Sequence, residues 1–165
     1  MPKTIQKVPD QLPSEITSTK QMFQSASSFD QDISGWDVSN VTDMSDMFAY
    51  ATSFNQNISV WRVEKVKIMR GMFFNAHAFD QNISSWNVNK VTDMHGMFAG
   101  ARKFNQDISG WDVSNVITMH SMFAGAITFD QNLSQWNVSK VIIHDNFAIN
   151  SWISNSIDKL PNFNF

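Results

Sequence analysis

The stretch Phe29–Phe54 reads FDQDISGWDVSNVTDMSDMFAYATSF, and it decides the fold because the same pattern returns every 25 residues. Ten of the fourteen Phe fall into two columns at this period, five of the six Trp into a third, and nine of the ten Met into two more. Repetition at a fixed period of 20 to 50 residues indicates a stacked repeat architecture. The columns are Phe23/48/73/98/123, Phe29/54/79/104/129, Trp36/61/86/111/136, Met22/47/72/97/122 and Met44/69/94/119.

Spacing within one repeat predicts a short strand followed by a short helix. Trp36 and Val38 alternate around Asp37, which is the period of a strand. Later apolar positions are spaced by three and four residues, as on one face of an α or 3₁₀ helix. The expected helix begins near the column of Asp43 and ends near the column of Tyr50, which elsewhere holds Asn or Gly.

These elements predict an α/β solenoid of the leucine-rich-repeat kind, with one short parallel strand and one short α or 3₁₀ helix in each repeat. Such a helix is too short to be stable alone, so the stability must come from stacking. The expected organisation is an N-terminal cap with a partial repeat at 1–21, five repeats at 22–146, and a C-terminal cap at 147–165.

Composition excludes several classes of function. The 165 residues include no cysteine, which rules out disulfides, thiolate metal sites and a cysteine nucleophile. A net charge of −3 gives no electrostatic footprint for nucleic acid. The apolar runs are too short to span a bilayer or to form the core of a signal peptide, so we expect no membrane insertion.

The recurring string of Phe29–Phe54 resembles the BspA-type leucine-rich-repeat surface proteins, in the 25-residue variety seen in mycoplasma lipoproteins and lactobacilli. The resemblance implies a leucine-rich-repeat-like solenoid on a cell surface or secreted, used for adhesion or for binding proteins and glycans. It implies no catalytic residue. The lipoprotein signal and its cysteine do not occur in this sequence, which leaves the compartment open.

The invariant aromatic and Met columns have two readings each. The Trp residues could form a stacking platform for sugars. However, each Trp lies two residues before a Val and so on the same face of the expected strand, which favours the core. The Met columns could form a sticky groove or bind soft metals, but helical spacing favours an irregular interior.

A column of Gln with polar neighbours also recurs. The Gln side chains could donate to a ligand, although a ladder of amides that bond one another and the turn backbone is favoured. The flanking Asp and Asn columns suggest calcium only weakly, since one repeat alone holds Asp at both places. These columns are Gln31/56/81/106/131, Asp30/Asn55/Asp80/Asn105/Asp130 and Asp32/Asn57/Asn82/Asp107/Asn132.

Candidate metal and catalytic groups are few. His95 and His120 lie one period apart and could chelate Zn²⁺, but Arg70 in the same column indicates a solvated face. No Ser/His/Asp set recurs and no Gly-rich phosphate loop is present, so we expect no enzyme, no metal site and no cofactor.

The outward side chains of the expected strand remain as the candidate binding surface. Their identity changes from repeat to repeat while their inward neighbours do not. Polar side chains of this kind suit glycan hydroxyls or a polar protein surface, and a plain soluble surface is the alternative. We define the ridge as these ten residues: Asp37, Arg62, Asn87, Asp112, Asn137, Ser39, Glu64, Asn89, Ser114 and Ser139.

The sequence thus predicts a non-enzymatic scaffold for cell-surface adhesion or for binding a protein or glycan through the ridge. The partner would lie on a host or neighbouring cell surface. The alternative is a structural protein that self-associates through its ends, which the atypical terminal repeats favour.

Overall fold

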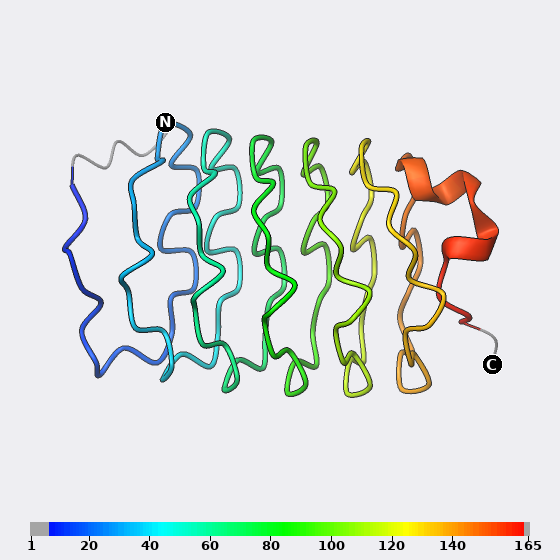
Figure 1. Cartoon of the computed structure of the whole chain (residues 1–165), viewed down its shortest axis with the longest axis horizontal. Coiled ribbons are helices and arrows are strands. Elements are labelled where there is room, and N and C mark those ends of the chain that lie inside the picture. The colour runs from blue at the N-terminus through cyan, green and yellow to red at the C-terminus, as the bar shows by residue number, and fades with distance from the viewer. Residues whose placement is uncertain (1–6, 164–165) are drawn as a thin grey trace.

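The computed structural model describes residues 7–163, and its repeats lie side by side along one axis (Figure 1). Each repeat forms one coil of the stack, and equivalent residues of adjacent coils are 25 positions apart in sequence. The first coil lies at one end of the molecule and the C-terminal helices lie at the other (Figure 1). The stacked arrangement brings each sequence column into a line that runs along the stack.

Among the described residues, regular secondary structure is confined to two short 3₁₀ helices near the C-terminus, η1 at Trp152–Asn155 and η2 at Ile157–Lys159. Within residues 7–163 the repeats contain neither a strand nor an α-helix. The expected strand at 36–38 and the expected helix at 43–50 therefore do not form. Adjacent coils instead meet in isolated parallel bridges, at Ser18–Asp43, Asp43–Ile68, Ile68–Asp93, Asp93–Thr118 and Thr118–Ile143.

A run of consecutive tight turns takes the place of the expected helix. The N–H groups of Met44, Asp46 and Phe48 donate to carbonyl oxygens of the next coil at 2.8–2.9 Å. The intervening N–H groups of Met47 and Ala49 donate within their own coil, three residues back, at 3.1–3.2 Å. Alternate amides thus stabilise the turn and the stack, whereas a helix would have used its N–H groups internally.

Left-handed residues make this alternation possible. Positive φ angles occur four residues apart in each run, for example 54° at Asp46 and 60° at Tyr50. Asn, Asp and Gly tolerate this conformation best. All positive φ angles of the described residues fall in two columns, Gln21/Asp46/Gly71/Gly96/Ser121/Asn146 and Ser25/Tyr50/Asn75/Gly100/Gly125/Asn150.

The core is a set of stacked side-chain columns that extends through every coil. The Phe, Met and Val columns are almost completely buried except at Met22, which is half-buried, and the five Trp of the column are 3–5% exposed. Phe48 stacks on Phe54 within its coil at 3.9 Å between ring centroids, and on Phe73 of the next coil at 5.6 Å. Parallel rings repeated in this way bury large apolar areas with defined geometry.

Candidate functional site

The ridge lies on the segment that precedes each turn run. The ridge consists of two columns, of which the first starts at Asp37 and the second at Ser39. The first column is exposed in every coil, and the flanking Trp and Val columns are buried. The second column is half-buried in four coils and exposed only at Ser139. The alternation between inward and outward residues is thus present, although the backbone there forms no strand.

Side-chain oxygens of the ridge also support the backbone. The Oδ1 atoms of Asp37 and Asp112 accept hydrogen bonds from the N–H two residues on, at 2.9 and 3.1 Å. Asn87 and Asn137 make the same contact at 3.2 Å. These local turns hold the ridge backbone in one shape while leaving the other oxygen or the amide group for solvent or a ligand.

Serine donors lower the pKa of the two ridge aspartates. Hydrogen bonds from Ser39, chiefly from its side chain and secondly from its backbone N–H, hold the pKa of Asp37 below its ordinary value. Ser114 lowers the pKa of Asp112 in the same way. Hydrogen bonds to the ionised form favour that form. Both carboxylates are therefore charged at neutral pH and present fixed negative groups along the ridge.

The second full repeat differs from its neighbours. Arg62 has no oxygen to offer the backbone, and its Nε lies 3.4 Å from Oε1 of Glu64. The two side chains are 74% and 41% exposed, so the ion pair contributes little to stability. Arg62 instead gives the middle of the ridge its one positive group.

The Gln and Asp/Asn columns form a polar ladder between coils. The Asn55 N–H donates to Oδ1 of Asp30, and the Asp80 N–H donates to Oδ1 of Asn55, at 2.8 and 2.9 Å. The amide nitrogen of Gln106 donates to the Asp80 carboxylate at 2.8 Å. Gln56, Gln106 and Gln131 donate to backbone carbonyls of the Asp/Asn column in the preceding coil, as the expected ladder requires. Gln81 and Gln131 donate to Asn side-chain amides of that column, so the amide-to-amide bonds run from Gln to Asn and, among these four Gln, not from Gln to Gln.

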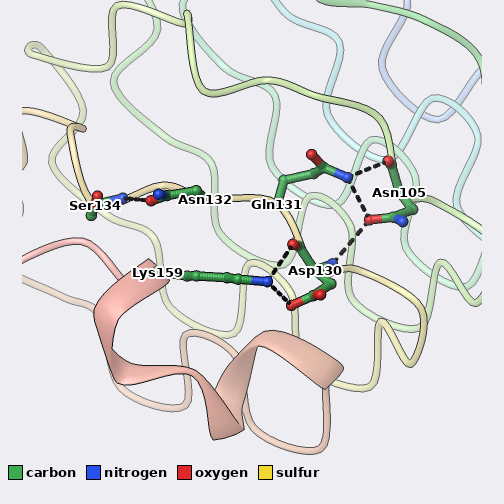
Figure 2. Close-up of polar contacts among 6 residues, drawn as sticks. All are labelled: Asn105, Asp130, Gln131, Asn132, Ser134 and Lys159. Atoms are coloured by element: carbon green, nitrogen blue, oxygen red, sulfur yellow. Dashed lines mark hydrogen bonds and ion pairs between the residues drawn. The ribbon is translucent and has the colours of Figure 1, made fainter.

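Lys159 of η2 ends this ladder at the C-terminal side (Figure 2). Its Nζ donates to the carboxylate of Asp130 at 2.8 Å and to the Asp130 carbonyl at 3.3 Å. The ammonium group thus replaces the backbone and Gln donors that a further coil would bring. Part of the polar sequence pattern is therefore structural.

The other candidate sites are the Trp column and the His95–His120 pair. Each of the five Trp in the repeat column is buried and donates its indole N–H to a backbone carbonyl, so the column belongs to the core and cannot serve as a sugar platform. His95 and His120 stack at 4.8 Å between ring centroids. Among the described residues, no group of three or more His, Asp or Glu is placed to hold a metal ion. Burial, followed by the nearby Arg70, lowers the pKa of His95.

Two features were not predicted from the sequence: the hydrogen bonds from Asp and Asn side chains to the backbone two residues on, and the left-handed column of Asp46. A signal for the first was present, because Asp or Asn recurs two residues before Ser or Asn in most repeats. The signal for the second was Gly71 and Gly96 at the same column as Asp46. In neither case does hydrophobic periodicity report the feature, since both concern backbone geometry.

A stack of near-identical coils, each bonded only to its neighbours, defines a repeat protein. The family model described as "Mycoplasma protein of unknown function, DUF285" matches residues 3–94 and again residues 58–160. The chain therefore belongs to this family. Comparison with curated proteins and with solved structures gave no match. None of the helices in the part of the chain that the structure describes has the length and apolar character to span a membrane.

Proposed function

We propose that the protein is a non-enzymatic binding scaffold of the BspA-like, leucine-rich-repeat-like type, a solenoid that recognises a protein or glycan through the ridge. The observation that supports it is the contrast between a backbone repeated in every coil and a ridge column that changes from coil to coil. A regular frame that presents variable polar groups is how repeat proteins form extended binding surfaces.

The chemistry of the ridge favours a polar partner. Asp37, Arg62, Asn87 and Asp112 place two negative groups, one positive group and one amide in a line over four coils. Such a line suits the hydroxyls of a glycan or a polar segment of a protein exposed on a cell surface. We propose the cell surface or the extracellular space as the site of action.

The test replaces ridge chemistry while keeping ridge geometry. A triple variant Arg62→Ala, Asn87→Asp and Asp112→Asn keeps both backbone-bonding oxygens but changes the charge at each of the three positions. We expect it to lose binding on a glycan array or to a panel of cell-surface proteins that the unmodified chain binds. The control Lys103→Ala changes an exposed cation outside the ridge and should bind normally. Equal binding by both variants would refute the ridge as the binding surface.

A further inference from the structure

The first turn run of the stack presents unpaired hydrogen-bond acceptors. In the interior, carbonyl oxygens such as those of Ser45 and Met47 accept from N–H groups of the preceding coil. The equivalent carbonyls of Lys20, Met22 and Gln24 accept no hydrogen bond from any described residue. One end of the molecule therefore carries a row of acceptors.

The last turn run presents the matching donors. In the preceding coil, the N–H groups of Ser121 and Phe123 donate to the last coil at 3.0 and 2.7 Å. The equivalent N–H groups of Asn146, Ala148 and Asn150 donate to no described residue. Asn146 and Asn150 hold positive φ angles of 57° and 59°, so the last run has the same shape as the interior runs.

The two rows match in register. Continuing the interior pattern by one coil would pair Asn146 N–H with Lys20 C=O, Ala148 with Met22 and Asn150 with Gln24 of a second copy. Unpaired backbone rows of this kind are templates for association with another chain.

Charges at the two ends are also complementary in the same register. One column of equivalent positions starts at Lys20, passes through His95 and His120, and ends at Asp145. The ring centroids of His95 and His120 lie 4.8 Å apart, which shows how close side chains of this column are in adjacent coils. A second column starts at Glu15 and ends at Lys140. A second copy in register would thus place Lys20 beside Asp145 and Glu15 beside Lys140, and all four side chains are exposed.

The unpaired N–H groups of Asn146, Ala148 and Asn150 lie beside a cavity and beside exposed apolar side chains. A cavity of about 620 Å³ lies between the last turn run and the C-terminal segment, lined by Phe147, Ile149, Ile157, Leu160 and Phe163 among others. Ile149 is 48% exposed and Ile157 is 86% exposed. At every interior junction the equivalent space is filled by the next coil.

We propose that a second copy of this chain binds there, head to tail, with its first turn run seated on the last turn run of its neighbour. This interface differs from the ridge and goes beyond the proposed ligand binding. Because the two contacting surfaces are different, the contact does not close on itself and would extend into a chain of molecules.

The C-terminal segment competes with this contact. The Phe163 ring stacks on His144 at 4.4 Å and meets Phe147 at 5.1 Å between ring centroids, so the segment covers part of the last turn run on which a second copy would sit. Docking therefore requires the segment to move, and Lys159 holds it through Asp130. Lys159 thus acts as a latch that limits association.

Cysteine cross-linking of full-length chains tests the contact, because the chain has no cysteine of its own. A Lys20→Cys chain is mixed with a Asp145→Cys chain under mild oxidation, and a disulfide-linked dimer of the two is expected. In the control pair, Lys20→Cys is mixed with Lys103→Cys, which lies mid-stack and should form at least tenfold less dimer. Equal yields from the two pairs would overturn the proposal.

Two further variants separate docking from random collision. Lys159→Gln in the Asp145→Cys chain should raise the rate of cross-linking several-fold, whereas Lys103→Gln should not. Glu15→Lys in the Lys20→Cys chain should lower the rate, and Lys140→Glu in the Asp145→Cys chain should restore it. Circular dichroism confirms that each variant is folded. A cross-linking rate that changes neither with Lys159→Gln nor with Glu15→Lys and Lys140→Glu would contradict the head-to-tail contact.

Discussion

At the scale of single residues, the molecule depends on side chains that pack and bond in the same way in every coil. Trp86 is 3% exposed, and its indole nitrogen donates to the Ile58 carbonyl at 3.1 Å. Asp112 is exposed yet bonds the backbone two residues on. Exposure alone therefore does not separate functional from structural residues in this protein.

We expect Trp86→Ala to lower the free energy of unfolding by roughly 3–5 kcal/mol, because it leaves a cavity and removes one of the two hydrogen bonds that the Ile58 carbonyl accepts, the other coming from the Trp61 N–H. Denaturation by urea measures the change. Trp152 is the matched control, since it is 63% exposed and lies outside the repeat columns. Trp152→Ala should change stability by no more than about 0.5 kcal/mol. Similar losses in both variants would contradict a buried Trp column.

The aspartates with bonded side chains should make stability depend on pH. Hydrogen bonds from nearby serines lower the pKa of Asp32, Asp37, Asp107 and Asp112 in the folded state. A lowered pKa adds stability that is present above the unfolded pKa of about 3.9 and is lost as the pH falls through the folded value. Replacing all four by Asn keeps the acceptor but removes the titration.

The fourfold Asn variant should therefore lose less thermal stability than the unmodified chain between about pH 5 and pH 2. Thermal unfolding followed across this range measures the difference. If the two melting curves shift in parallel, the serine contacts do not favour the charged carboxylates.

At the scale of elements, the sequence predicted where the chain would be compact but assigned the wrong local geometry. Met44, Met47 and Phe48 are buried as the periodicity indicated. A pattern of three- and four-residue steps does not distinguish a helix from consecutive turns, because both place these residues on one side. Gly71 and Gly96 in one column with Asp46 were the better indicators of a left-handed position.

Gly96→Ala distinguishes the two geometries by the sign of its effect. Alanine in a helix is about 1 kcal/mol more favourable than glycine, so a helix at 93–100 would become more stable. In the turn run Gly96 has φ of +58°, and its added Cβ would meet nothing nearer than 3.7 Å. We therefore expect a loss of about 1 kcal/mol that arises from backbone conformation alone.

At the ridge, the sequence predicted the direction of the side chains but not the pairing of the backbone between coils. Alternation around Trp36 and Val38 correctly placed Asp37 outside and its neighbours inside. The pairing of coils at Asp43 was not foreseen, because bridges depend on which backbone groups remain unpaired after local turns form.

At the scale of the whole molecule, each coil contacts its neighbours through the same hydrogen bonds and columns. Removal of residues 76–100, one full period, would join Asn75 to Ala101 and keep every column in register. We expect this shorter chain to fold cooperatively with reduced stability and a smaller dependence on denaturant. Removal of residues 76–87 alone would break the register, and that chain should fail to fold. Denaturant titrations of both chains measure these outcomes.

Amide hydrogen exchange tests most directly the central claim, that alternate amides of each turn run bond the next coil. The measurement compares Ser121, Phe123 and Gly125, which donate to the last coil, with Asn146, Ala148 and Asn150, which donate to no described residue. At concentrations where the chain is monomeric, the first three amides should exchange slowly and the second three rapidly. Equal protection of the two sets would contradict bonding between coils, because it would mean that the amides are bonded within each repeat, as in a helix.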